Sequence, residues 1–424
     1  LTLLFTTDIH SNLVPHQALL EGRGERVGGF ARLSAAVKAH TVPGSTLLLD
    51  SGDFSMGTLY QAYCQSDALE LRLMDQIGYD AIALGNHDFE LPDGGIREEL
   101  TRYRESGGSA AILCSNLVAA PGEKAATEAN PLADVGVQSY AVVERNGFKI
   151  GLFALMGKEA VQYTPADPLA FADPVETARV CVRLLREREG VDLVIALSHS
   201  GVTPDQSYTE EIEIAKAVNG IDVILSGHMH QALPLPLEAN GTMIACAGTG
   251  LAYLGKLTLR RVDGAWVAAD HQLIPLTNAW ADDPAIVELI APYTERLETE
   301  YMAKYGVSAG LDEVVATTPY DFSDAELFRR CDNHAFGALL ADAYLDTLRA
   351  EGMNDVWIAG VPTGTVRAGL YRGEMTLMDV YNVLSYGISP LDGSSGAPII
   401  TAYLTGSGLY DVCETSISLS GLNG

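Results

Sequence analysis

The chain has 424 residues, 47% of them hydrophobic, which is enough for two or three domains with buried cores. Its 55 acidic and 27 basic side chains give a net charge of −28. Because nucleic acids and membrane surfaces are anionic, this charge excludes a nucleic-acid polymer as partner and argues against a membrane-surface protein. No apolar run reaches the length of a membrane span, so we expect no transmembrane segment.

Short apolar runs alternate with helical patterns over residues 1–277. Several runs are apolar at consecutive positions, as in strands that are buried on both faces. The predicted strands are Leu1–Thr6, Thr46–Asp50, Ala81–Leu84, Ala110–Cys114, Lys149–Ala154, Leu193–Leu197, Val223–Leu225 and Met243–Cys246. The predicted helices are Gly28–His40, Ala68–Ile77 and Val175–Glu189. This alternation predicts a layered α/β domain.

A boundary is expected after residue 277. Asp283 and Pro284 form a helix start, and apolar residues at helical spacing follow as far as Gly306, so residues 278–307 should form a connecting helix. Residues 308–424 are predicted to be a second, smaller α/β domain. Its predicted elements are the helices Phe336–Arg349 and Leu377–Val383 and the strands Asp355–Ala359 and Pro398–Leu404.

Polar side chains follow five of the predicted strands, at the strand ends where ligands collect in α/β sheets. Helix capping alone would favour Ser, Thr and Asn at such positions, whereas these places hold five of the nine histidines. The set therefore predicts a metal site. The candidate ligands are Asp8, His10, Asp53, Asn86, His199, His228 and His230.

The number and type of the candidate ligands indicate how many metal ions the site holds and of which kind. One zinc ion needs three or four protein ligands, so seven candidates suggest two divalent cations about 3.5–4 Å apart that share a carboxylate. Asp53 lies between the two sets in sequence and is the best bridging candidate. Carboxylate, amide and imidazole donors without cysteine suit Mn²⁺, Zn²⁺ or Fe, and the sequence leaves the choice open.

The order of these motifs resembles the calcineurin-like metallophosphoesterases, and more narrowly the 5′-nucleotidase family. The motifs are D-x-H at Asp8–His10, G-D at Gly52–Asp53, G-N-H-D at Gly85–Asp88, an isolated His199, and G-H-x-H at Gly227–His230. The narrower resemblance rests on Gly28–Leu33, Asp88–Glu90, Ala341–Ala343, Gly364–Arg367 and Leu404–Gly406. It implies a four-layer α/β/β/α sandwich that a helix joins to a substrate-binding domain.

The resemblance also implies roles for the ligands. One cation would take Asp8, His10, Asp53 and His230, and the other Asp53, Asn86, His199 and His228. Many nucleotidases have glutamine at the position of His230, which follows the broader phosphoesterase pattern here. The cations would activate a bound water for attack on phosphorus.

His87 lies beside a candidate ligand without being assigned as one. The resemblance implies that it stabilises the transition state and protonates the leaving oxygen, with Glu90 orienting it and holding it protonated. The family usually has Asp at the position of Glu90, which is one methylene longer.

In the second domain, Arg367 matches an arginine that would bind substrate phosphate, with Asn86 as a further substrate contact. The family next has Pro-Phe-x-Asn, with Phe stacked on the base. This chain has Ser385–Ile388, so Tyr386 would supply the aromatic face. Only 18 residues follow Gly406, fewer than is usual in the family, so we expect this domain to be shortened or incomplete.

The expected function is metal-dependent hydrolysis of nucleotide phosphoesters, with a small nucleotide or another phosphate ester as substrate. Alternatives on the same scaffold are 2′,3′-cyclic nucleotides, UDP-sugar pyrophosphates or a thiosulfohydrolase-type reaction, and lastly a non-catalytic binding protein. The family is mostly exported, and a chain that starts at Leu1 fits a removed export signal. Scattered cysteines, such as Cys114 and Cys246 in apolar runs, favour free thiols and a cytoplasmic location instead. The sequence does not define the oligomeric state.

Overall fold

The computed structural model describes residues 1–91, 94–119, 130–164, 169–203, 209–324, 327, 334–389 and 393–420. The chain forms two compact units, which we call the first and the second unit. The first unit consists of Leu1–His16 and Arg26–Met302, and the second of Gln17–Glu25 and Ala303–Gly424.

Two sheets form the centre of the first unit. The seven-stranded sheet has the order β17-β16-β1-β4-β5-β6-β8, and the six-stranded sheet has the order β14-β15-β13-β12-β10-β9. The seven strands are β1 (Thr2–Thr6), β4 (Thr46–Asp50), β5 (Ala81–Ala83), β6 (Ala111–Leu113), β8 (Val137–Gln138), β16 (Tyr253–Val262) and β17 (Ala265–Pro275). The six are β9 (Ala141–Arg145), β10 (Phe148–Met156), β12 (Leu193–His199), β13 (Val223–Ser226), β14 (Leu237–Ala239) and β15 (Thr242–Cys246). All eight predicted strands are found.

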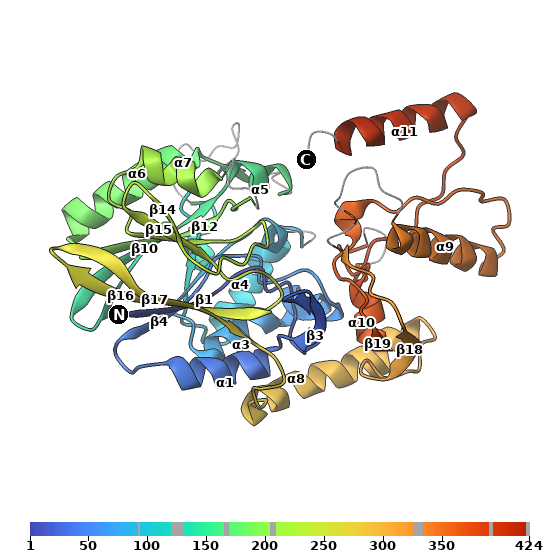
Figure 1. The fold of residues 1–424 in the computed structure, drawn as a ribbon, viewed down its shortest axis with the longest axis horizontal. Helices are drawn as coiled ribbons and strands as arrows, with labels where there is room; N and C mark the ends of the chain where they lie inside the picture. The colour runs from blue at the N-terminus through green and yellow to red at the C-terminus, as the bar shows by residue number, and fades with distance from the viewer. Residues whose placement is uncertain are drawn as a thin grey trace. The chain divides into compact units, whose positions relative to one another are not determined.

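Helices cover both outer faces of the sandwich. Figure 1 shows α6 and α7 on the six-stranded sheet, and α1 and α3 below the seven-stranded sheet. The helices of this unit are α1 (Phe30–His40), α2 (Cys64–Asp67), α3 (Leu69–Ile77), α4 (Gly95–Glu105), α5 (Lys158–Gln162), α6 (Pro174–Arg183) and α7 (Glu210–Ala217). A short pair of strands, β7 (Leu117–Ala119) and β11 (Leu169–Phe171), lies outside the two sheets. The predicted four-layer α/β/β/α fold is confirmed.

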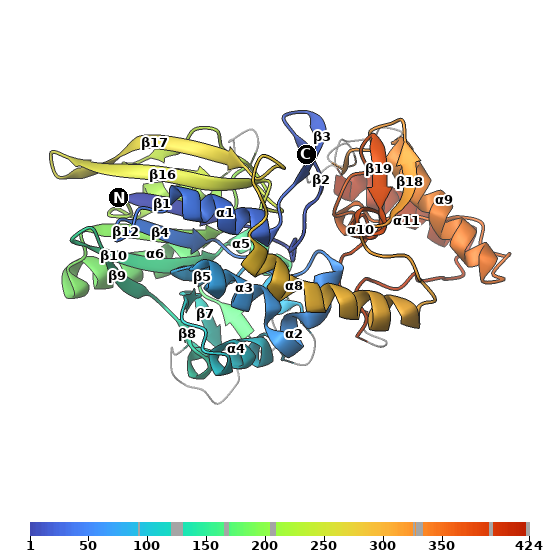
Figure 2. The ribbon, with the colours of Figure 1, turned by 90° about the horizontal axis from the view of Figure 1, so that it is seen from below.

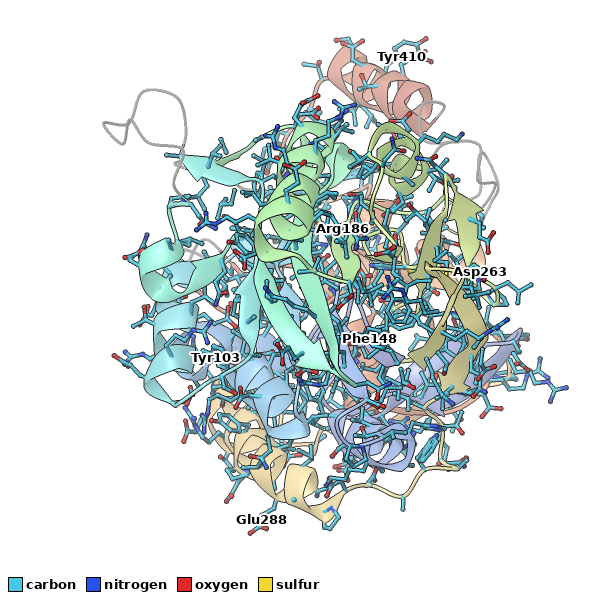
Figure 3. All side chains as sticks on the ribbon, turned by 90° about the vertical axis from the view of Figure 1, so that its left-hand side faces the viewer. Tyr103, Phe148, Arg186, Asp263, Glu288 and Tyr410 are labelled. Atoms are coloured by element: carbon cyan, nitrogen blue, oxygen red, sulfur yellow. The ribbon has the colours of Figure 1, made fainter. Side chains whose placement is uncertain are left out.

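The main core lies between the two sheets. It is built from inward-facing residues of both, such as Leu47 of β4 and Ile195 of β12, which are fully buried. At its margin lies Phe148 of β10, which is labelled in Figure 3. Its ring packs edge-on against that of Trp266 of β17, with centroids 4.8 Å apart. A second core joins the six-stranded sheet to α6 and α7. Both faces of the central strands are buried, so their sequences are apolar at consecutive positions. For this reason the strands could be predicted from the sequence.

The sequence after the sandwich forms α8 (Pro284–Arg296), which continues as a π-helix over Leu297–Met302. Asp283 caps α8 by accepting a hydrogen bond from the amide of Ala285 at 3.2 Å. The same carboxylate accepts hydrogen bonds from Ser34 and Lys38 of α1, which attaches the start of α8 to α1.

The described residues of the second unit form few regular elements. These are β18 (Val314–Thr318), β19 (Gly373–Thr376), α9 (Ala335–Ala350), α10 (Leu377–Asn382) and α11 (Gly406–Ser420). Both helices predicted for this segment, at Phe336–Arg349 and Leu377–Val383, are found within a residue or two. A hairpin of β2 (His16–Leu20) and β3 (Arg23–Val27), from early in the sequence, also packs here. The side-chain amide of Gln17 donates to the carbonyl of Glu374 and accepts from the amide of Tyr371.

The strands predicted at Asp355–Ala359 and Pro398–Leu404 are wrong. Neither run is paired as a strand, and the side chains of Trp357 and Tyr403 are 86% and 92% exposed. A strand is stable only when its backbone groups find partners in a neighbouring strand, and apolar composition cannot supply that partner. The two runs instead meet through one hydrogen bond, from the Tyr403 hydroxyl to Asp355 at 2.7 Å.

In the described ranges, no helix combines the length and the apolar composition that a membrane span requires. Cys64, Cys114, Cys181 and Cys246 are buried free thiols and Cys413 is an exposed one, while Cys331 lies outside the described residues.

Candidate metal centre

The loops after the strands hold their polar residues in an unusual backbone conformation. Five of the seven candidate ligands have positive φ angles of 50° to 76°, a left-handed region that side chains other than glycine rarely adopt. These five are Asp8, His10, Asp53, His228 and His230. Such strain persists only where the surroundings fix it, and it is concentrated at functional sites.

Backbone hydrogen bonds supply that fixation. The amide of Asp8 donates to the carbonyl of Gly52 at 2.9 Å, and the amide of His10 donates to the carbonyl of Asp53 at 3.0 Å. The loop after β1 is thereby bound to the loop after β4. The loop after β5 approaches so closely that a side chain on Gly85 would lie 2.1 Å from Asp53 Oδ1, which explains the glycine.

The first donor group consists of Asp8, His10 and His230, whose donor atoms lie within 4.8 Å of one another. The Nε2 atoms of His10 and His230 are 3.0 Å apart, and that of His230 is 3.6 Å from Asp8 Oδ1. His10 Nδ1–H donates to the carbonyl of Met56 at 2.9 Å, which leaves the lone pair on Nε2 for the centre of the group.

The second donor group consists of Asp53, His199 and His228. His199 Nδ1–H donates to the carbonyl of Ser51 at 2.9 Å, and its Nε2 lies 3.0 Å from Asp53 Oδ2. The two groups adjoin, because the amide of His228 donates to both carboxylate oxygens of Asp8, at 3.0 and 3.1 Å.

The buried polar atoms of this region fit bound cations. Asn86 Oδ1 and His228 Nε2 are buried without a hydrogen-bond partner, a state that is costly unless something else contacts them. Both are donor atoms of types that divalent metals accept.

Charge is distributed unevenly over these residues. Burial raises the pKa of Asp8 to about 7. For Asp53, burial is outweighed by His199, His87 and His10, which hold its pKa well below the ordinary range. The same pairing overcomes burial at His199 and raises its pKa to about 10, whereas burial and His199 lower the pKa of His228 to about 3. A cation bound beside His199 would replace the proton on its Nε2, because a metal ligand must be a neutral imidazole.

His87 lies at the edge of the donor groups. Its Nδ1 is 3.0 Å from Glu90 Oε1, so the additional methylene of Glu90 does not prevent the two side chains from meeting. Its ring centroid is 5.2 Å from that of His10, and its amide donates to Asp53 Oδ1 at 2.9 Å. The structure thus brings His87, Glu90 and the candidate ligands of both groups together.

Sequence reasoning missed the role of Asp88. Its fully buried carboxylate accepts from the amides of Asp53, Gly85 and Ser55, at 3.0, 2.8 and 3.1 Å, and from the Ser55 hydroxyl. Asp88 therefore ties the loop after β4 to the loop after β5. Its position directly after His87 could have indicated a role. However, a sequence does not distinguish an aspartate that bonds to neighbouring loops from one that is exposed to solvent.

Arg367 and Tyr386 both lie in the second unit, half-buried. The guanidinium of Arg367 lies 5.5 Å from the centroid of the Tyr386 ring, within the range of a cation–π contact. The amide of Arg367 donates to the carbonyl of Val383 at 2.9 Å. Because Val383 is three residues before Tyr386, this bond holds the backbone of Arg367 close to the segment that carries Tyr386.

Two adjoining groups of carboxylate and imidazole donors, at the strand ends of an α/β/β/α sandwich, define the class of metal-dependent phosphoesterases. The chain belongs to the calcineurin-like phosphoesterase family, whose model matches residues 1–232. The resemblance inferred from the motifs is confirmed.

Relatives extend the similarity beyond this domain. The trifunctional nucleotide phosphoesterase protein YfkN of Bacillus subtilis is 24% identical over 99% of this chain and 28% of its own length. The probable 5′-nucleotidase of Treponema pallidum is 32% identical over 55% of this chain and 37% of its own length. The chain thus spans about a third of the length of these curated relatives. The structure of a 5′-nucleotidase precursor from Thermus thermophilus superposes with a TM-score of 0.69 and 25% identity, over 91% of this chain and 73% of that one.

Proposed function

We propose that the chain is a metal-dependent hydrolase of nucleotide phosphoesters, of the 5′-nucleotidase type. The observation that carries the proposal is the pair of adjoining buried donor groups with the His87–Glu90 pair beside them. Relatives named as nucleotidases support the nucleotide as substrate, because they match this chain over most of its length.

Asp8, His10, Asp53 and His230 would hold one cation, and Asp53, Asn86, His199 and His228 the other. The unpartnered Asn86 Oδ1 and His228 Nε2 support this assignment. Two divalent cations, when bound, supply Lewis-acid stabilisation of the phosphoryl oxygens and lower the pKa of water. The absence of cysteine from both groups favours Mn²⁺, Zn²⁺ or Fe over a metal that selects thiolate.

His87 is the proposed acid. With Nδ1 directed at Glu90, its Nε2 is the nitrogen that can donate a proton to the leaving oxygen. Glu90 would orient the ring, because its Oε1 lies 3.0 Å from His87 Nδ1. Asp53 orients the same residue from the backbone side, through its bond to the His87 amide.

In the second unit, Arg367 would bind substrate phosphate and Tyr386 would stack on the base. The cation–π contact supports this pairing, because it holds the guanidinium and the ring in one place. Asn86 would contact the phosphate as well as a cation. We further propose that the protein is exported, as its relationship to a 5′-nucleotidase precursor suggests.

The test is hydrolysis by the purified 424-residue chain of AMP, 2′,3′-cyclic AMP, UDP-glucose and p-nitrophenyl phosphate, with the products of each reaction separated and quantified by chromatography. Each substrate is assayed with Mn²⁺, Zn²⁺ or Fe²⁺ after elemental analysis of the protein. We expect AMP to be the best substrate. If p-nitrophenyl phosphate alone is hydrolysed, the substrate is not a nucleotide, although the chain is still a phosphoesterase.

A broader phosphoester specificity is the second candidate, and the block Ser385–Ile388 favours it. Ile388 stands where the family has a polar asparagine, which removes a contact to the base. If this candidate holds, 2′,3′-cyclic AMP or UDP-glucose will be hydrolysed faster than AMP in the same assay.

A further inference from the structure

A second polar cluster lies in the interior of the first unit, away from the seven candidate ligands. It consists of Cys64, Glu70 and Glu99, and we call it the thiol–carboxylate cluster. The sulfur and one oxygen from each carboxylate lie within 4.8 Å of one another, and all three side chains are completely buried. They come from α2, α3 and α4, and Figure 2 shows α2 and α4 side by side.

The hydrogen bonds of this cluster are incomplete. Glu70 Oε1 accepts from the Ser11 hydroxyl at 2.6 Å, but Glu70 Oε2 and both oxygens of Glu99 are buried without a partner. In the described part of the chain, no Lys, Arg or His pairs with either carboxylate. A buried carboxyl group with neither a hydrogen-bond partner nor a counter-charge destabilises the fold unless another group contacts it.

The unmet group of this cluster is Glu99. The Cys64 thiol and the Glu70 carboxyl group share a hydrogen bond, whereas neither oxygen of Glu99 makes one, although the cluster's donor atoms lie within 4.8 Å of one another. Burial, reinforced by Glu70 and Asp88, raises the pKa of Glu99 well above its ordinary value, so its charge is unfavourable without a cation beside it.

The spacing suits donors around a shared ion. Thiolate and carboxylate donors at 2.0–2.3 Å from zinc are separated from one another by about 3–4 Å. A small closing of the three side chains would therefore suffice. The Ser11–Glu70 bond resembles the outer hydrogen bonds that orient metal-binding carboxylates.

We propose that Cys64, Glu70 and Glu99 form a third cation site, which binds Zn²⁺ or a metal of similar thiolate affinity. Binding releases the thiol proton and any proton on the carboxyl groups to solvent, and forms one metal–sulfur and two metal–oxygen bonds. The site is structural. It joins three helices and, through Ser11, supports the loop that carries His10.

The test uses Co²⁺ as a spectroscopic substitute for zinc in the full 424-residue chain, after chelation of the bound metals. Coordination of Co²⁺ by a thiolate produces a charge-transfer band in the near ultraviolet. The proposed dinuclear centre contains no cysteine and cannot produce this band. We expect three equivalents of cobalt per chain, with the band developing in proportion to one of them.

Matched variants identify the thiolate that produces the charge-transfer band. Cys64→Ser and Glu99→Gln should each lose it together with one of the three equivalents. Cys246→Ser, which alters a buried thiol elsewhere in the unit, and Cys413→Ser, which alters an exposed one, should keep both. Circular dichroism confirms that each variant is folded.

Two outcomes overturn the proposal: a wild-type chain that binds no more than two equivalents without a thiolate band, or a band that survives in Cys64→Ser. Neither outcome affects the proposed hydrolase. That function fails separately, if the Mn²⁺-loaded chain hydrolyses no substrate of the panel.

Discussion

The two units place their polar chemistry in opposite settings. In the first unit, Asp8, Asp53 and His199 lie at the ends of strands whose apolar residues fill two large cores, and all three are buried. In the second unit the core is one small cluster around Phe336 and Leu340, and Trp357 is largely exposed. The first unit therefore has the rigidity to hold charged donors in a strained geometry, and the second does not.

That difference fits a division of labour. Left-handed backbone at five candidate ligands is tolerated because neighbouring loops bind one another through Asp88 and through backbone bonds such as that of Asp8 with Gly52. A nucleoside, by contrast, is recognised by aromatic faces and hydrogen bonds that need less exact placement. The predictions below test this contrast, starting with the largest effect.

His87→Ala should lower turnover on the order of 10²–10⁴-fold, the usual contribution of a general acid. Bound metal should not change, because His87 is not among the seven candidate ligands. Rates and elemental analysis of the same preparation measure both. His40→Ala, at the end of α1, should retain the wild-type rate. An unchanged rate in His87→Ala would remove this residue from the mechanism.

Glu211→Gln tests how much one buried carboxyl group of the first unit contributes to the pH dependence of the unfolding free energy. Glu211 Oε1 accepts from the Gly201 amide and the Ser226 hydroxyl, both at 2.7 Å, and burial raises its pKa from 4.5 to about 7. The folded state therefore binds this proton more tightly than the unfolded state. The stability contributed by the group is present below pH 4.5 and is lost as the pH rises through 7.

Over that interval the wild type should lose about 3 kcal/mol of unfolding free energy that Glu211→Gln retains. Urea unfolding in the presence of chelator, at pH 5 and at pH 8, measures the difference. Glu213→Gln, on the exposed side of the same helix, serves as the control and should follow the wild type. Equal pH dependence in Glu211→Gln and wild type would contradict the prediction.

Glu90→Gln should reduce kcat about 10–100-fold, the range found when a partner that orients a functional imidazole is lost. KM and metal content should stay unchanged, because Glu90 contacts His87 and is not a candidate ligand. Glu90→Asp should recover part of the loss, since it keeps the carboxylate. A rise in KM without a fall in kcat would assign Glu90 to substrate binding instead.

Much of the first unit could be predicted because its strands are continuous apolar runs and its site residues follow those strands in a recognisable order. Arg367 and Tyr386 could be named from the same order of motifs. The positive φ angles could not be predicted, since they arise from contacts between loops that are distant in sequence, such as Asp8 with Gly52.

Long-range pairing also explains the errors. Nothing local in the hairpin β2–β3 shows that Gln17 will bond to Tyr371, 354 residues away. The same applies to Trp357 and Tyr403, where apolar side chains suggested strands and no partner strand was present. Cys64, Glu70 and Glu99 come together only when three helices pack.

Tyr386 gives the smallest expected effect and the most direct test of the second unit. Tyr386→Leu removes the ring, and stacking on a base is worth about 1–3 kcal/mol, so KM for AMP should rise at least about fivefold. Tyr386→Phe keeps the ring face and should behave like the wild type. Neither variant should change kcat/KM for p-nitrophenyl phosphate, which carries no base, because the proposed catalytic pair His87 and Glu90 lies in the first unit. If Tyr386→Leu weakens both substrates equally, the second unit supports the site without recognising the base, and the contrast between the two units is smaller than we propose.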